Sequence, residues 1–225
     1  MDKQELHGLF KGVFPFWNGM SEVDKETFCR SSQIVKFKKG TNIHDGNECT
    51  GIILVRKGSL RMYMLSEDGK EITLSRFFPG EMCILSASCV LHTVTFDVFV
   101  DSEDESDCVV IGGCAFEDLA RRMPEAKIFA LESALSSFSD IMWVMQQILF
   151  MSMDKRLAIF LLDEVAKSGS DTVKLTHEQI AKYMGSAREV VSRMIKYFVS
   201  EGLVSSSRGA GITILDKKRL RALTQ

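Results

Sequence analysis

Charged and apolar residues are almost completely separated between Thr176 and Phe198, a segment that reads THEQIAKYMGSAREVVSRMIKYF. When the residues from Arg188 onward are placed at about 100° per residue, five polar residues fall on one arc of about 140° and the apolar residues fill the opposite arc. The five polar residues are Arg188, Glu189, Ser192, Arg193 and Lys196. A helix needs this separation if one side is buried and the other enters a groove of DNA.

The residues before this helix predict a first helix and a tight turn. Thr176 stands three residues before Gln179, which is the capping-box pattern at the start of a helix. Gly185 supplies the turn that is usual between the two helices of a helix-turn-helix unit. An ordinary helical pair with a solvated charged face is the alternative. The arrangement favours a DNA-binding unit in which Thr176 and Ser186 also lie at the DNA.

The second predicted helix carries side chains that can read bases. Arginine can donate two hydrogen bonds to guanine, and glutamate can accept one from cytosine, in the major groove. Arg188, Glu189 and Arg193 supply these groups near the start of the helix, the part that contacts bases in helix-turn-helix proteins. Lys196 is predicted to meet a phosphate. Ser186 and Glu189 also fit a capping box, so Glu189 can instead fold back on its own helix, and both uses stay open.

The C-terminal residues predict a wing and a local positive charge. Residues 203–204 and 212–215 read as a short hairpin around a turn of small residues, with Arg208 at its tip, where a phosphate can be met. Residues 151–225 contain 13 Lys+Arg against 8 Asp+Glu, whereas residues 1–150 contain 15 against 22. Because phosphate neutralisation needs local positive charge, the formal net charge of -2 does not exclude DNA as a partner.

Composition is typical of a soluble chain of 225 residues, with 45% hydrophobic and 26% charged residues. No continuous apolar run reaches the length of a membrane span, and the first residues lack a signal-peptide pattern, so we expect a cytoplasmic protein. The six cysteines, at positions 29, 49, 83, 89, 108 and 114, form no CxxC pair and are expected to be buried or partly buried thiols. Cys83, Cys89 and His92 are close in sequence, but their spacing matches no standard metal, haem or redox pattern, and no metal site is predicted.

Two patterns organise the remaining chain. From Ile34 to about Ile111, short β-rich runs alternate with glycine turns, which predicts an all-β sandwich or barrel. From Ile128 onward, large apolar residues recur at alternating steps of three and four, which is typical of a coiled-coil seam. These residues are Ile128, Leu131, Leu135, Phe138, Met142, Met145 and Leu149. A helix packed on its own domain is the alternative. A homodimer is favoured, and it would place two recognition helices about 34 to 36 Å apart.

The order of these elements resembles the cyclic-AMP receptor protein and fumarate-nitrate regulator (CRP/FNR) family of bacterial transcription factors, from about Phe16 to Leu223. The resemblance rests on the KKG, RKG and FPGE turns, the MDKRLAIFLL segment and the helix pair with Arg188-Glu189-x-x-Ser192-Arg193. It implies an α+β fold in three parts. These are a double-stranded, jelly-roll-like β-roll that senses an effector (1–125), a dimerisation helix (126–152) and a winged helix-turn-helix domain (153–225).

The resemblance also implies roles for the recognition residues. Glu189 and Arg193 match the residues that read a half-site of an inverted repeat. Arg188 matches the guanine-reading arginine of the cyclic-AMP receptor branch, whereas Ser192 matches the serine of the fumarate-nitrate branch. Half-sites of the TGTGA and TTGAT types therefore both stay open. RNA polymerase is an expected partner, and activation or repression is left undecided.

The expected sensor domain departs from both branches. Gly80 and Glu81 match the ribose-binding position of cyclic-nucleotide binders, but no arginine or lysine lies between Glu81 and Arg121 to bind a phosphate, which argues against cyclic AMP. Cys29 is the only cysteine before Cys49, which argues against an iron-sulfur cluster. The effector is left unknown, and a small polar or redox-active molecule would suit the implied pocket. The pocket residues are Gly80, Glu81, Cys83, Ser86, Ser88 and Cys89, for which a structural role is equally open.

Two other functions compete with an effector-controlled regulator. A constitutive DNA binder would use the β-roll only as a scaffold or protein-contact surface. A cupin-type metalloenzyme would need clustered histidines on barrel strands, but only His44 and His92 fall in that region and no HxH pair exists. We therefore do not expect an enzyme.

Overall fold

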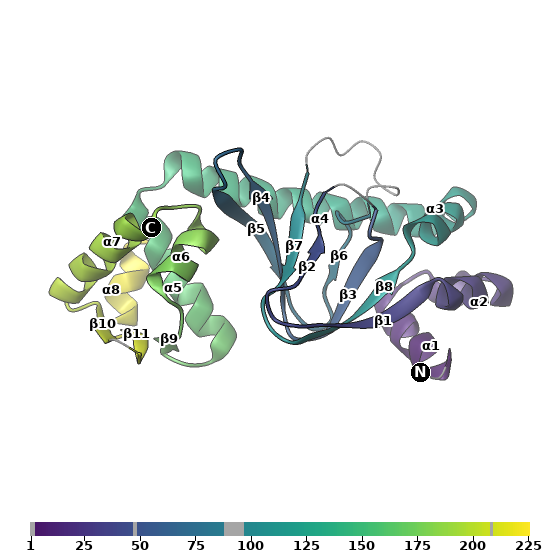
Figure 1. Cartoon of the computed structure of the whole chain (residues 1–225), viewed down its shortest axis with the longest axis horizontal. Coiled ribbons are helices and arrows are strands. Elements are labelled where there is room, and N and C mark those ends of the chain that lie inside the picture. Colours follow the sequence, from purple (N-terminus) through teal and green to yellow (C-terminus); the bar gives the residue numbers. More distant parts are fainter. Residues whose placement is uncertain (1–2, 47–48, 88–96, 208) are drawn as a thin grey trace. The chain divides into compact units, whose positions relative to one another are not determined.

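The computed structural model describes residues 3–46, 49–87, 97–207 and 209–225. The chain forms two compact units, of which the first comprises Met1–Leu65 and Leu74–Ile141 and the second comprises Ser66–Thr73 and Met142–Gln225. Figure 1 labels the helices and strands of both units. The units divide within one long helix, so the three-part division predicted from the sequence stays a prediction.

Two four-stranded antiparallel sheets form the β part of the first unit, with strand orders β1-β8-β3-β6 and β2-β7-β4-β5. This agrees with the predicted β-roll. The strands are β1 (Ser32–Phe37), β2 (Asn42–His44), β3 (Ile52–Lys57), β4 (Leu60–Leu65), β5 (Glu71–Phe77), β6 (Met82–Cys83), β7 (Phe99–Ser102) and β8 (Ser106–Ile111).

Glycine allows the tight connection between β3 and β4. Gly58 has a φ of 83°, a conformation that side chains with a Cβ rarely adopt, and an added Cβ would lie only 2.4 Å from the Ser106 hydroxyl oxygen. Ser106 is itself buried and hydrogen-bonds the Ser102 hydroxyl at 2.9 Å. The RKG motif is therefore a turn that packs against buried serine hydroxyls, and only glycine fits at position 58.

Helices that precede and follow the β-roll in the sequence enclose one cluster of aromatic rings. The helices are α1 (Lys3–Val13), the 3-10 helix η1 (Trp17–Gly19), α2 (Glu22–Arg30) and α3 (Gly113–Arg122). Phe10, Phe14, Phe28 and Phe116 are at most 1% exposed, and their rings contact one another with centroids 5.2 to 6.5 Å apart. The sequence pattern did not predict these four helices, which seal one end of the roll.

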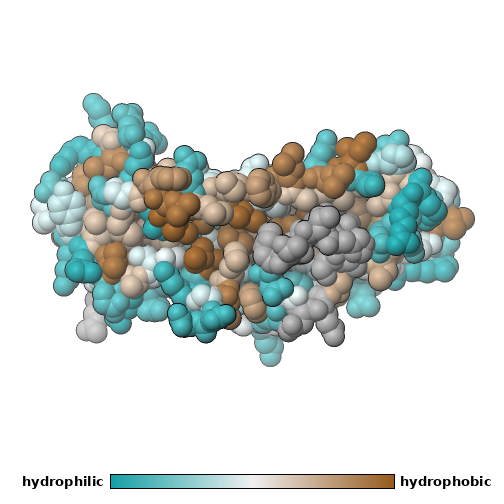
Figure 2. Space-filling view, turned by 90° about the horizontal axis from the view of Figure 1, so that it is seen from above, coloured by the Kyte–Doolittle hydropathy of each residue, from teal (hydrophilic) through white to brown (hydrophobic). Residues whose placement is uncertain are grey.

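The long helix α4 (Pro124–Phe150) has one buried face and one exposed apolar face. Ala126, Ala130, Ser137 and Ile141 are buried. The seven residues of the predicted seam, in contrast, are all between 45% and 64% exposed. Hydrophobic side chains gather on the surface over this helix (Figure 2). We call these seven residues, from Ile128 to Leu149, the α4 seam.

By length and composition, α4 alone among the helices of the described residues could cross a membrane. An 18-residue window has a mean hydropathy of 1.3, and 11% of that window is buried. Four charged residues, Glu125, Lys127, Glu132 and Asp140, and several serines interrupt the helix. The helix therefore contains no continuous apolar run long enough to span a membrane, as expected from the sequence.

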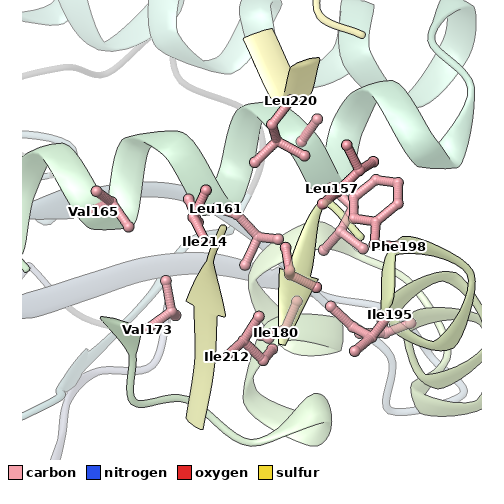
Figure 3. Close-up of a cluster of buried hydrophobic side chains, with 14 of the residues drawn as sticks. Leu157, Leu161, Val165, Val173, Ile180, Ile195, Phe198, Ile212, Ile214 and Leu220 are labelled. Carbon is pink, nitrogen blue, oxygen red and sulfur yellow. The ribbon is translucent and has the colours of Figure 1, made fainter. Parts of the chain in front are cut away.

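The second unit packs four helices and a small sheet around one apolar core. The helices are α5 (Met153–Ser168), α6 (His177–Met184), α7 (Arg188–Ser200) and α8 (Lys217–Ala222), and the strands are β9 (Thr172–Val173), β10 (Val204–Ser207) and β11 (Gly211–Ile214). Leu161, Ile180 and Phe198, which come from three of the helices, are 0% exposed and point into this core (Figure 3). Burial of these side chains fixes how α6 and α7 lie against α5.

Candidate nucleic-acid interface

The first helix of the pair begins with the predicted capping box. The Thr176 hydroxyl accepts a hydrogen bond from the Gln179 backbone N–H at 3.1 Å, and the Gln179 side-chain oxygen accepts one from the Thr176 N–H at 2.8 Å. Each bond satisfies an amide that has no partner within the helix. The prediction for the start of α6 is confirmed.

Replacing Thr176 by alanine should lower the free energy of unfolding by about 1 kcal/mol, because the cap hydroxyl is lost. Thr176→Ser keeps the hydroxyl and should lose much less. Urea denaturation of the full chain, followed by circular dichroism, measures both. Equal losses in the two variants would show that the cap hydrogen bond contributes nothing.

The turn after α6 uses Gly185 as expected. Its φ of 58° is left-handed, and its N–H lies 3.4 Å from the Lys182 carbonyl oxygen. The following amide, of Ser186, donates to the Ala181 carbonyl oxygen at 2.9 Å. This pair of bonds is a Schellman motif, which ends α6 and lets the chain reverse into α7.

Helix α7 exposes the predicted polar face. Val191, Ile195 and Phe198 are buried, whereas the predicted contact residues lie on the outer side. Arg188, Glu189, Arg193 and Lys196 are exposed, and Ser192 is half-buried. Tyr197 falls on the apolar arc when α7 is projected at about 100° per residue, but its side chain is 51% exposed. The apolar contact stripe is therefore narrower than the sequence pattern indicated.

The start of α7 excludes one of the two uses proposed for Glu189, the cap on its own helix, and contact with a base stays a prediction. The N-cap of α7 is Ala187 and not Ser186, and no side chain forms a cap hydrogen bond there. The Ser186 hydroxyl lies instead 3.9 Å from the Met153 sulfur. The second capping box is therefore not formed, because the Schellman motif uses the Ser186 amide and the helix begins two residues later. The Glu189 carboxylate stays exposed.

Four charged side chains of α7 have no partner within the part of the chain that the structure describes. Among the residues that the structure describes, Arg188, Glu189, Arg193 and Lys196 make no hydrogen bond or ion pair. On α8 of the same unit, by comparison, Lys217 pairs with Asp171 and Arg219 pairs with Glu201. We call these four α7 residues the α7 charged face. Because these four side chains make no contact of this kind within the described residues, they remain available to bind a ligand.

The wing borders a hollow beside α6 and α7. The strands β10 and β11 pair antiparallel, and β11 also pairs with β9. A cavity of about 510 Å³ lies between this sheet and the starts of α6 and α7. Its lining includes Lys174, Thr176, His177, Arg188, Ser206 and Ser207. Arg208, the predicted phosphate contact at the wing tip, lies outside the described residues.

Sequence reasoning missed four polar residues of this hollow, namely Lys174, His177, Ser206 and Ser207. Lys174 and His177 flank the N-cap Thr176, so their position beside an expected DNA contact was a usable signal. The two serines were assigned only to a turn of small residues. In the structure they belong to β10, which borders the hollow.

The predicted effector residues occupy different environments. Gly80 and Glu81 are exposed at a turn, where the Glu81 carboxylate accepts a hydrogen bond from the Phe78 N–H at 2.9 Å. Cys83 and Ser86 are 0% exposed, and the Ser86 hydroxyl donates to the Gly51 carbonyl oxygen at 2.7 Å. Ser88 and Cys89 lie outside the described residues, as does His92. The effector pocket therefore stays a prediction.

The cysteines depart in two places from the expected buried or partly buried thiols. Cys29, Cys83 and Cys108 are free and buried, and burial raises the pKa of the Cys108 thiol to about 11. Cys114 is free but exposed. Cys49 is disulfide-bonded, so the expectation of a thiol is wrong at this position. Within the described part of the chain, no three His, Cys, Asp or Glu side chains are placed to hold a metal ion.

Two family models match the chain. A cyclic nucleotide-binding domain matches residues 34–123, and a Crp-like helix-turn-helix domain matches residues 155–223. The transcriptional activator protein anr of Pseudomonas aeruginosa is 24% identical over 194 residues, which cover 83% of this chain and 78% of that protein. The FixK2 structure from Bradyrhizobium japonicum shares the fold, with a TM-score of 0.69 at 17% identity over 86% of this chain and 98% of that one.

A much more similar structure comes from Eubacterium rectale. It is a crystal structure described as a transcriptional regulator of the CRP/FNR family, 43% identical, with a TM-score of 0.89. The alignment covers 95% of this chain and 99% of that one. Both the β-roll and the helix-turn-helix unit lie within this range. The chain therefore belongs to the CRP/FNR family of DNA-binding transcription regulators.

Proposed function

We propose that this regulator is a homodimer that reads an inverted-repeat operator with the α7 charged face. One observation carries the proposal. Arg188, Glu189, Arg193 and Lys196 are exposed on one side of a helix whose other side is buried, and they have no partner among the described residues. A protein that only needed solubility would gain from pairing Glu189 with one of these cations.

Each residue of the charged face has a role that its chemistry supports. Arg193 and Arg188 would donate to the O6 and N7 atoms of guanine, and Glu189 would accept from the N4 amino group of cytosine. Lys196, one turn further along, would contact a phosphate. The hollow at the start of α6, with Lys174 and His177 on its lining, would receive the adjacent phosphate backbone.

The α4 seam supports the dimer. Seven large apolar side chains at heptad spacing are about half exposed. Burying one such side chain completely contributes about 1.5 to 3 kcal/mol, so a second copy of the helix would gain several times that amount. A second copy of the chain carries the same apolar residues at the same heptad spacing, so the two α4 seams would pack against each other. The two-fold axis would then set two α7 helices about one turn of DNA apart.

We also propose that an effector bound by the β-roll controls the regulator. The match of residues 34–123 to a cyclic nucleotide-binding domain supports a sensing role for the β-roll. The burial of Cys83 and Ser86 in the core favours the alternative of a constitutive DNA binder. We infer that the protein acts in the cytoplasm, and that bound dimers contact RNA polymerase.

Selection of bound sequences from a pool of random duplexes tests the proposal. The full chain is incubated with the pool in the presence and in the absence of cell extract, and the bound duplexes are sequenced. An enriched inverted repeat supports a dimeric reader, and dependence on extract supports an effector. Enrichment without such dependence favours the constitutive binder. If no sequence were enriched among the bound duplexes, sequence-specific reading would be contradicted.

Lys196→Ala should weaken binding to the selected operator and to a scrambled duplex by similar factors. The physical reason is that a phosphate contact carries no base information. The slope of log affinity against log salt concentration should decrease by about one, for the one phosphate no longer neutralised. Fluorescence anisotropy at several salt concentrations measures both. A loss confined to the operator would instead place Lys196 at a base.

A further inference from the structure

Helix α5 contacts both sides of the turn that joins α6 to α7. Met153 and Arg156 lie three residues apart on α5 and therefore share a face. The Met153 sulfur lies 3.9 Å from the Ser186 hydroxyl. The Arg156 guanidinium donates a hydrogen bond to the carbonyl oxygen of Met184, the last residue of α6. The two contacts hold the residues just before and just after Gly185.

A third contact continues along the same face of α5. Phe160, four residues beyond Arg156, stacks on Tyr183 with ring centroids 5.8 Å apart and an interplanar angle of 25°. Tyr183 precedes Met184 in the last turn of α6. The end of α6 is thus tied to α5 by a ring stack and a charged hydrogen bond.

Arg156 occupies a position that is unfavourable for a charged side chain. It is only partly exposed, and burial lowers the pKa of its guanidinium because the charged form loses hydration. Its buried Nε finds no hydrogen-bond acceptor among the described residues. An apolar residue of similar length would avoid this desolvation but would leave the Met184 carbonyl without the Arg156 donor. The burial of the charge itself is therefore unfavourable, and what the arginine contributes is its hydrogen bond to Met184.

The Met184 carbonyl needs a donor from outside its own helix. The last carbonyls of a helix have no intrahelical partner, and the negative end of the helix dipole favours a cation there. The Ser186 and Gly185 amides donate to the Ala181 and Lys182 carbonyl oxygens, respectively. The Met184 carbonyl oxygen accepts from Arg156, which lies on another helix. The orientation of the turn therefore depends on α5.

We infer that Arg156 is a positioning residue, which holds the turn between α6 and α7 so that the α7 charged face meets the bases in one fixed orientation. This inference rests on the proposed function. Arg156 itself is not expected to touch DNA. Its effect reaches the bases through Met184, Gly185 and the start of α7.

The test compares Arg156→Met with Lys155→Met, a matched control. Lys155 is the adjacent cation on α5 and also donates to a carbonyl oxygen, that of Gln225, at 2.8 Å. Hydrogen–deuterium exchange of the duplex-free chain is followed over residues 184–190. We expect Arg156→Met to accelerate exchange there about tenfold, with no change in Lys155→Met. Arg156→Lys, which keeps one donor, should restore part of the protection.

The same variants are then compared on the selected operator and a scrambled duplex. Arg156→Met should reduce the ratio of the two affinities about tenfold, the size of one weakened base contact, while the salt slope stays unchanged. Unchanged exchange would overturn the inference without any DNA measurement. A decreased salt slope would also overturn it, because Arg156 would then be a phosphate contact. Failure of the wild-type chain to discriminate would contradict the proposed function, whereas the exchange result would still stand.

Discussion

Leu135→Glu should convert the protein to a monomer and weaken operator binding by about 10²- to 10⁴-fold. Leu135 is 64% exposed in the middle of the α4 seam. In the proposed dimer two such residues meet near the axis, so two carboxylates would be desolvated against each other. A monomer binds one half-site and loses the advantage of linked binding, which gives the expected factor. Sedimentation velocity and anisotropy on the selected operator measure the two effects.

Ser136→Glu is the matched control for this variant. Ser136 is the next residue of α4 and is exposed, but its helical position points away from the seam. Ser136→Glu adds the same charge to the same helix as Leu135→Glu, and it should leave the dimer and the operator affinity unchanged. A dimer that survives Leu135→Glu would place the self-association surface elsewhere. Equal losses in both variants would indicate a general effect of charge on α4.

Arg193→Ala and Glu189→Ala should each reduce discrimination between the selected operator and a scrambled duplex by about 1 to 3 kcal/mol. That is the value of one good contact between a side chain and a base edge in the major groove. Affinity for the scrambled duplex should change much less, because it depends on phosphates. Both side chains are exposed and free of protein partners in the described structure. Competition binding with the two duplexes measures the difference directly.

Two further variants separate base reading from charge. Arg221→Ala removes an exposed cation on α8 that is not part of the α7 charged face, and should leave discrimination unchanged. Glu189→Gln keeps an oxygen that can accept from cytosine, so it should retain more discrimination than Glu189→Ala. If Arg193→Ala lowered affinity for both duplexes equally, direct base reading by Arg193 would be contradicted.

Features set by neighbouring residues could be predicted from the sequence. The Thr176 capping box, the left-handed Gly185 and the buried and exposed sides of α7 all depend on residues within about five positions. The heptad spacing of α4 is similarly local, and its apolar residues lie exposed on one side as expected. Such features follow from helix periodicity and from hydrogen bonds between near neighbours.

Features that depend on competition between two local patterns, or on distant residues, could not be predicted. Ser186 fits a cap by spacing, but its amide is already used to end α6, so α7 begins later. Tyr197 projects among the apolar residues, yet the core of the second unit does not reach it. The two-residue strand β9 forms only because β11, some 40 residues later, pairs with it. No local pattern marks a strand this short.

The amino-acid sequence by itself determined the helix pair, its turn, the polar face of α7 and the apolar seam of α4. Only the tertiary structure decided that Arg156 is turned inward to Met184 while Arg193 has no partner among the described residues. Both residues are arginines on amphipathic helices, so their sequence surroundings do not distinguish them. The difference arises from which elements pack beside each helix, because burial and hydrogen-bond partners are set by contacts between residues far apart in the chain.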